Sequence, residues 1–188
     1  MALRPAPALV LVDLQRAMDH PRWGRRNNPA LETNVARLLA AWRERGWPVH
    51  HVAHRSVAPG STYAANGPGA PFKPEATPLA GEPVTEKRAH SAFVGTDLEA
   101  RLREGGVRRL VVAGVLTNGS VEATVRHAAD LGFEVAVAAD ACATFDKVDL
   151  DGRSWSAEEV QALSLANLSV EYARILTVDA LLAGGGGR

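Results

Sequence analysis

The sequence predicts an α/β fold: a three-layer αβα domain with a mostly parallel, open sheet of about six strands and helices on both faces. The first observation is an alternation. Apolar segments of strand length are followed by segments whose apolar residues recur at helical spacing. The second is that the strand segments are continuously apolar, as in ALVLVDL at 8–14. This is typical of strands buried on both faces of a parallel sheet.

The individual elements follow from these patterns. Strands are expected at 8–14, 48–53, 83–86, 110–113, 135–139 and 173–178. Helices are expected at 31–42, from 96 to near 105, at 120–131, and from 156 through 168. The second and fourth helices are predicted to begin with capping boxes, formed by Thr96 with Glu99 and by Ser156 with Glu159. Residues 55–83 are rich in Gly, Pro, Ala and Ser and form a long connection of the kind that often carries function.

Length and composition bound the function. The 188 residues are 46% hydrophobic and 22% charged, which predicts one domain at 1–183 followed by a flexible Gly-rich tail at 184–188. The net charge is zero, without the basic excess that nucleic-acid or anionic-membrane binding usually needs. No apolar run approaches the roughly 20 residues that span a bilayer. One cysteine, Cys142, excludes an internal disulfide, and no signal-peptide pattern opens the chain, so we expect a cytoplasmic protein.

Polar residues at the ends of the predicted strands mark the candidate site, because ligands of open α/β sheets bind beyond the carboxyl ends of the strands. Asp13 ends the first strand, Lys87 follows the short third strand, 117–120 follow the fourth, and Asp140 ends the fifth. Taken singly, each has an ordinary structural explanation, such as a helix cap or a solvated loop cation. Their joint pattern favours a functional site.

That joint pattern resembles the isochorismatase-like, or cysteine hydrolase, superfamily, which includes nicotinamidases, N-carbamoylsarcosine amidases and isochorismatases. Three segments carry the resemblance: VDLQ at 12–15, GEPVTEKRAHSAFVGTDLE at 81–99, and VVAGVLTNGSVEATVRHAADLGFEVAVAADACATFD at 111–146. The resemblance implies a catalytic triad of aspartate, lysine and cysteine. Its first two members fall on Asp13 and Lys87, but the cysteine position holds Ser120. It also implies a cis peptide bond between Val115 and Leu116, with the backbone N–H groups of Leu116 and Ser120 forming an oxyanion hole.

The serine at position 120 leaves three alternatives open. It is the natural residue of a subgroup with altered or lost covalent chemistry, a Cys→Ser change that traps a complex, or a true serine nucleophile. A serine needs a strong general base, because a helix N-terminus alone shifts a pKa far too little to ionise a hydroxyl. Asp13 beside Lys87 is expected to be a poor base, since a neighbouring cation keeps a carboxylate ionised. Cys142 is expected to be a buried structural thiol.

The leading prediction from the resemblance is hydrolysis of the C–N bond of a small amide through an acyl-enzyme at Asp13, Lys87 and Ser120. Its rivals are a catalytically silent, ligand-binding homologue and a vinyl-ether hydrolase of an isochorismate-like acid. The last would need a cation in the pocket, for which Arg16, Arg55 and Arg88 are weak candidates. Substrate contacts are predicted for Phe93, Trp23 and His54.

No cofactor or metal is expected. His50, His51 and His54 lie on a predicted strand, where His51 faces away from the other two. His50 and His54 would be about 13 Å apart, too far to share one ion. The glycines match neither GxGxxG nor GxxxxGK[ST]. The expected partners are a small-molecule substrate and, from the resemblance, further copies of the chain in a homodimer or homotetramer, with no nucleic acid and no membrane.

Overall fold

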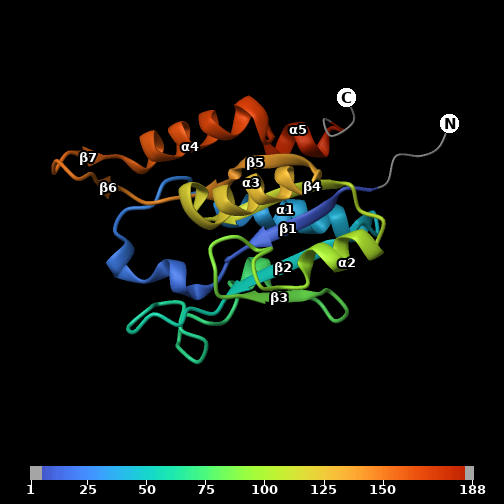
Figure 1. The fold of residues 1–188 in the computed structure, drawn as a ribbon, viewed down its shortest axis with the longest axis horizontal. Helices are drawn as coiled ribbons and strands as arrows, with labels where there is room; N and C mark the ends of the chain where they lie inside the picture. The colour runs from blue at the N-terminus through green and yellow to red at the C-terminus, as the bar shows by residue number, and fades with distance from the viewer. Residues whose placement is uncertain (1–5, 185–188) are drawn as a thin grey trace.

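A computed structural model describes residues 6–184 and confirms the predicted fold class. Its main sheet has six strands in the order β3-β2-β1-β4-β5-β8, and every neighbouring pair is parallel (Figure 1). The strands are β1 Ala8–Val12, β2 Val49–His54, β3 Val84–Lys87, β4 Arg109–Val115, β5 Glu134–Ala143 and β8 Arg174–Leu176. Most of the predicted Gly-rich tail, residues 185–188, lies outside the described residues.

Helices cover both faces of this sheet. The helices are α1 Leu31–Glu44, α2 Leu98–Glu104, α3 Glu122–Asp130, α4 Ala157–Glu171 and α5 Val178–Leu182, with short helical turns η1 Arg16–Asp19, η2 Pro21–Trp23, η3 Pro74–Ala76 and η4 Thr117–Val121. Helices α1 and α5 share one apolar core with the sheet. Helices α2, α3 and α4 share the other. No helix within 6–184 is long and apolar enough to cross a membrane.

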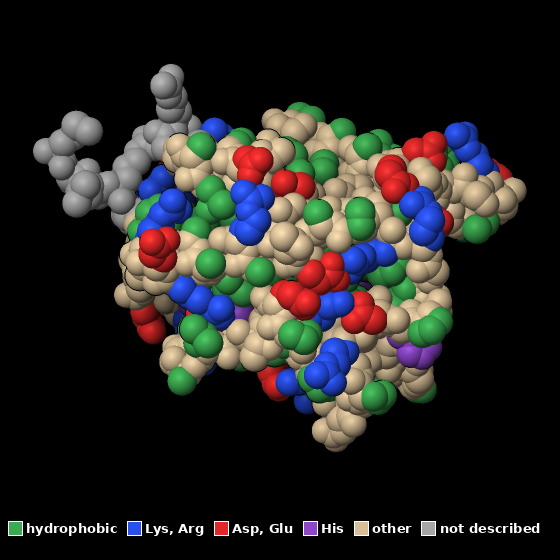
Figure 2. Space-filling view, turned by 180° about the vertical axis from the view of Figure 1, so that it is seen from behind, with side chains coloured by type: hydrophobic (Ala, Val, Ile, Leu, Met, Phe, Trp, Pro, Cys, Tyr) green, Lys and Arg blue, Asp and Glu red, His purple; other side chains and the backbone are tan. Residues whose placement is uncertain are grey.

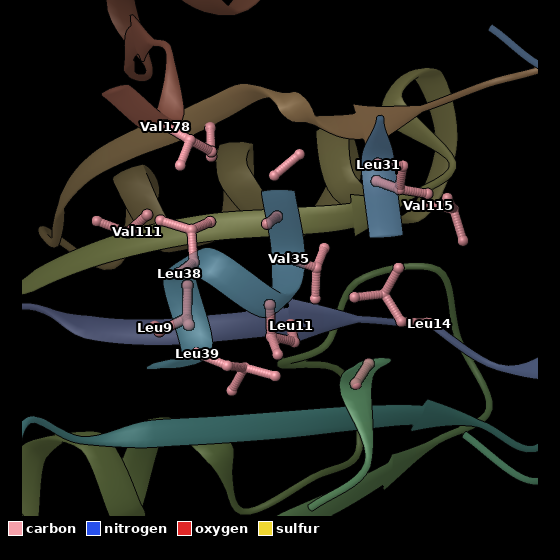
Figure 3. Close-up of a cluster of buried hydrophobic side chains, with 14 of the residues drawn as sticks. Leu9, Leu11, Leu14, Leu31, Val35, Leu38, Leu39, Val111, Val115 and Val178 are labelled. Carbon is pink, nitrogen blue, oxygen red and sulfur yellow. The ribbon is translucent and has the colours of Figure 1, made fainter. Parts of the chain in front are cut away.

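The central strand β1 explains why its sequence is continuously apolar. Leu9 and Leu11 pack toward α1, where Leu38 and Leu39 meet them (Figure 3). The alternate residues of β1 point into the opposite core. Because both faces are covered, every position in ALVLV is buried. This confirms the interpretation of that run as a strand with two buried faces.

Three local features differ from the sequence prediction. The capping box at Thr96 does not form, because Asp97 is the N-cap residue and the Thr96 hydroxyl donates instead to the carbonyl of Ala92. The predicted box at Ser156 and Glu159 is confirmed. The last strand ends at Leu176, and the residues after it form α5. The antiparallel hairpin of β6 Lys147–Val148 and β7 Ser154–Trp155, which projects from the body in Figure 1, was not predicted.

The strand order reverses between β1 and β4, which is where ligands of open α/β sheets bind. The two strands approach closely there. A Cβ atom added to Gly114 would lie 2.1 Å from the carbonyl oxygen of Val12, and the φ angle of Gly114 is +132°. Only glycine fits this position, so the contact that brings the ends of β1 and β4 together depends on it.

His50 gives β2 a pH-dependent stability. Its side chain is buried, its Nδ1 atom has no hydrogen-bond partner, and burial together with the Arg101 cation lowers its pKa from 6.5 to about 4. Since the pKa is lower in the folded state, the unfolded chain binds more protons between these values, and stability falls as pH falls from 6.5 toward 4.

We therefore expect the wild type to lose about 2 kcal/mol more stability between pH 7 and pH 5 than His50→Gln does. Urea unfolding at the two pH values measures the difference. The exposed His20, changed to Gln, serves as the control and should keep the wild-type pH dependence. Equal losses in the wild type and His50→Gln would rule this role out.

Candidate active site

Three side chains from distant parts of the chain meet at the carboxyl ends of the strands. Lys87 Nζ lies 2.7 Å from Asp13 Oδ2 and 3.1 Å from Ser120 Oγ. Asp13 follows β1, Lys87 ends β3, and Ser120 lies in the turn η4 after β4. The Lys87 side chain is 0% exposed and the Asp13 side chain 5%. The structure thus brings the three predicted triad positions into one buried cluster.

Lys87 reaches this cluster because of the strand period. In β3 the buried residues are Thr85 and Lys87, two apart, so the lysine points inward across the end of β2. There its Nζ atom lies 3.2 Å from His54 Nδ1 and 3.2 Å from the carbonyl oxygen of Ala89. His54 therefore joins the cluster through the lysine.

The backbone of Asp13 has an unusual conformation and is held by a hydrogen bond. Its φ angle is +56°, a conformation that few non-glycine residues adopt. Tyr63, from the long connection after β2, donates a hydrogen bond of 3.4 Å to the Asp13 carbonyl oxygen. In the carboxyl group, Oδ2 accepts from Lys87, whereas Oδ1 is buried without a hydrogen-bond partner. One carboxylate oxygen is therefore available to a proton or a substrate.

The turn η4 is irregular where it presents Ser120. Asn118 and Gly119 have non-helical backbone angles, and the peptide bond between Val115 and Leu116 is cis, as the resemblance implies. The carbonyl of Leu116 accepts hydrogen bonds from the backbone N–H groups of Gly119 and Val121. Because η4 runs directly into α3, Ser120 lies at the N-terminal end of that helix, where negative charge is favoured.

Comparison with known proteins agrees with this geometry. A family model described as the isochorismatase domain matches residues 7–179. The chain belongs to the isochorismatase family. The isochorismatase family protein YrdC of Bacillus subtilis (strain 168) is 36% identical over 93% of this chain and 94% of its own length.

A solved structure and a relative with a named activity extend the comparison. The structure of an isochorismatase-family protein from Chromobacterium violaceum ATCC 12472 is 51% identical, with a TM-score of 0.93 over 100% of both chains. Nicotinamidase 3 of Arabidopsis thaliana is 36% identical over 52% of this chain and 44% of its own length.

The electrostatics of this isochorismatase-family site differ from the sequence expectation. Burial raises the pKa of Asp13 above its usual value, and this outweighs the Lys87 charge and the hydrogen bonds of Lys87 and Ser120, which lower it. The expectation that Asp13 is a poor base considered only the neighbouring cation, and burial acts in the opposite direction. Burial also lowers the pKa of Lys87. It lowers that of His54 to about 4, so His54 is neutral at pH 7.

A group of aromatic side chains adjoins the cluster through Tyr63 and His54. The Trp23 ring stacks on Phe145 at 5.6 Å and meets Tyr63 edge-on at 6.2 Å. Tyr63 in turn lies edge-on to His54 at 5.7 Å. Two of the predicted substrate contacts, Trp23 and His54, therefore belong to the aromatic group beside Asp13. Tyr63 and Phe145 were not predicted, because nothing in the local sequence marks them.

The third predicted contact, Phe93, lies elsewhere. It packs into the core shared with α2, α3 and α4, with its ring 6.1 Å from Phe133 and 5.4 Å from His127. These contacts are those of a core residue, and its role at the substrate stays a prediction. Cys142 is fully buried, and burial raises its pKa to about 12, as expected for a structural thiol.

Metal ligation does not fit the residues present. Within 6–184, no group of three His, Cys, Asp or Glu side chains is placed to hold a metal ion. His51 Nε2 bonds to Glu82 Oε2 at 2.8 Å, and His54 faces Lys87. The side chains of His51 and His54 therefore bond to Glu82 and Lys87.

Proposed function

We propose that this isochorismatase-family hydrolase cleaves the C–N bond of a small amide, with Ser120 as the nucleophile and Asp13 as the group that takes its proton and gives it to the leaving nitrogen. The observation that carries the proposal is the buried contact of Lys87 with both Asp13 and Ser120. A carboxyl group made more basic by burial can hold a proton that an ordinary surface aspartate would release.

In this mechanism the Ser120 oxygen attacks the amide carbonyl carbon and its proton moves to Asp13. The backbone N–H groups of Leu116 and Ser120 are assigned to the developing oxyanion. Asp13 then protonates the leaving nitrogen, ammonia departs when the substrate is a primary amide, and water hydrolyses the acyl-serine by the same route. The neutral His54 accepts a hydrogen bond from Lys87 and keeps that side chain in position.

The aromatic group supports a small substrate with a flat apolar part. Tyr63 contacts the Asp13 backbone through its hydroxyl, and the Trp23 ring meets Tyr63 edge-on. The named activity of the Arabidopsis relative, a nicotinamidase, fits an amide attached to a ring. We accordingly assign Trp23 and His54 to the walls of the substrate pocket.

The remaining predictions concern partners and location. The homodimer or homotetramer, the small-molecule partner and the cytoplasmic location stay predictions. The face of the molecule seen in Figure 2 mixes Lys and Arg with Asp and Glu. Such mixing supports the expectation that this face does not bind nucleic acid, which would favour one continuous basic surface.

Two alternative functions have weaker support. For the vinyl-ether hydrolase, the candidate cation Arg55 lies 2.7 Å from Glu86, so its charge is already paired. A silent binding homologue would keep the cluster without turnover. It requires no particular value for the Asp13 pKa, so the burial that raises this pKa supports the hydrolase instead.

The test is ammonia release from a panel of small aliphatic and aromatic amides. We expect slow release by the wild type, at least tenfold faster release by Ser120→Cys because a thiol ionises far more easily, and none by Ser120→Ala. Release by the cysteine form alone would mean that Ser120 silences an intact cysteine-hydrolase site. If neither the wild type nor Ser120→Cys released ammonia, amide hydrolysis would be overturned.

A further inference from the structure

The Lys87 amino group has more polar neighbours than an ammonium has hydrogens to donate. Four atoms lie within 3.2 Å of Nζ: Asp13 Oδ2, Ser120 Oγ, Ala89 O and His54 Nδ1. An ammonium has three hydrogens. The Ala89 carbonyl can only accept hydrogen bonds, and the same holds for an ionised Asp13 carboxylate. Ser120 is the neighbour whose hydroxyl can donate as well as accept.

The Ser120 hydroxyl also acts on Asp13, since its hydrogen bond lowers the pKa of that carboxyl. The carboxyl group accepts from Lys87 through Oδ2, and its other oxygen has no partner. The Ser120 hydroxyl is close enough to influence Asp13, but the atom in hydrogen-bond contact with both groups is Lys87 Nζ. Through its two contacts, Lys87 therefore offers a proton from Ser120 a continuous path to Asp13.

We propose that Lys87 carries the proton between Ser120 and Asp13, as a relay. This inference rests on the proposed function, because it takes Ser120 as the nucleophile. It assigns the lysine a second role beside its charge: for as long as the proton is in transit, Nζ is an amine with a lone pair.

The transfer balances in one concerted step. Nζ passes one of its protons to Asp13 Oδ2 along the 2.7 Å contact and takes the Ser120 proton along the 3.1 Å contact. The serine oxygen bonds to the carbonyl carbon, and the carbonyl π-electron pair moves onto its oxygen. Lys87 ends as an ammonium beside a neutral Asp13. When the tetrahedral intermediate collapses, the C–N electron pair leaves with the nitrogen, which takes the proton from Asp13 by the reverse path.

Burial makes this relay energetically accessible. Desolvation disfavours both charges, so it raises the pKa of Asp13 and lowers that of Lys87. Both changes reduce the cost of moving a proton from nitrogen to oxygen. In water the same transfer would oppose a pKa difference of about 6.5 between ordinary lysine and aspartate side chains.

The first test compares Lys87→Arg in two backgrounds. Arginine keeps the positive charge and the hydrogen-bond donors but does not give up a proton. We expect Lys87→Arg to lower kcat for amide hydrolysis at least about 10³-fold with serine at position 120, yet at most about tenfold in the Ser120→Cys background, because a thiol needs less help. Equal losses in the two backgrounds would overturn the relay and leave the lysine a purely electrostatic role.

A second variant covers the case in which arginine disturbs the fold. Lys87→Ala leaves a space beside Asp13, and added ethylamine or methylamine can enter it as the missing base. We expect these amines to restore at least tenfold of the lost activity, whereas tetramethylammonium, a cation without an exchangeable proton, restores none. Rescue by tetramethylammonium to the same extent would contradict proton transfer.

A readout without substrate separates the relay from the proposed function. Diisopropyl fluorophosphate forms a P–O bond with an activated serine and releases fluoride, and intact mass reports the adduct. We expect labelling of the wild type, none of Ser120→Ala, and at least 10²-fold slower labelling of Lys87→Arg. Iodoacetamide labelling of Ser120→Cys verifies access. An unlabelled wild-type serine at an accessible site overturns the relay, whereas labelling without ammonia release overturns only the amide substrate.

Discussion

Asp13→Asn is expected to lower kcat/KM for amide hydrolysis by about 10⁴-fold, both with serine at position 120 and in Ser120→Cys. Asparagine has the shape of aspartate but cannot accept a proton near neutral pH. In both backgrounds the nucleophile's proton would have no destination. Ammonia release measures the loss, and Asp19→Asn, at an exposed aspartate paired with Lys73, is the matched control that should keep full activity.

Stability has to be checked in the same experiment. Removing the Asp13 charge leaves the Lys87 ammonium buried beside a neutral amide, and breaking a buried pair in this way costs about 3–5 kcal/mol. The double variant Asp13→Asn with Lys87→Met removes both charges and should regain most of the stability without regaining activity. Turnover of Asp13→Asn within tenfold of the wild type would refute the role of Asp13.

The second large effect concerns Gly114. In Gly114→Ala the new methyl group would lie 2.1 Å from the Val12 carbonyl oxygen, so β1 and β4 would have to move apart at the cluster. We expect the free energy of unfolding to fall by at least about 3 kcal/mol, since backbone atoms cannot yield as a flexible side chain can. Urea unfolding measures the change.

Gly81 supplies the control for backbone strain alone. Its φ angle is also positive, at +89°, but a Cβ atom there would meet nothing within 4 Å. Gly81→Ala should therefore cost only about 1 kcal/mol. If the two variants lost the same stability, the close approach of β1 and β4 would not be what requires glycine at position 114.

The sequence was informative where patterns are local. The continuously apolar run of β1 predicted a strand buried on both faces, and its end located Asp13 at the carboxyl end of that strand. Lys87 and Ser120 were placed by resemblance to a family, and the structure brings both to Asp13. The short hairpin β6–β7 and α5 escaped prediction because elements of two to five residues show no periodicity.

What could not be predicted depends on contacts distant in the chain. The raised pKa of Asp13 follows from burial, which segments far from it in sequence produce. Tyr63 reaches Asp13 from within the long connection at 55–83, where neither spacing nor composition distinguishes it from its neighbours. The contacts of Phe93 were not predictable for the reverse reason, since a ring in a loop can still turn into the core.

The position of β1 in the sheet also affects how the chain folds while it is being synthesised. This strand pairs on one side with β2 and on the other with β4, whose Leu110 is the partner of Ala8. A ribosome adds roughly 5–20 residues per second, so about 100 residues and roughly 5–20 s separate the two halves of that pairing. Throughout this interval ALVLV has an unpaired edge, which is a template for pairing with other chains. Abundant chaperones, which can cover this edge until β4 is made, should therefore raise the yield of folded protein.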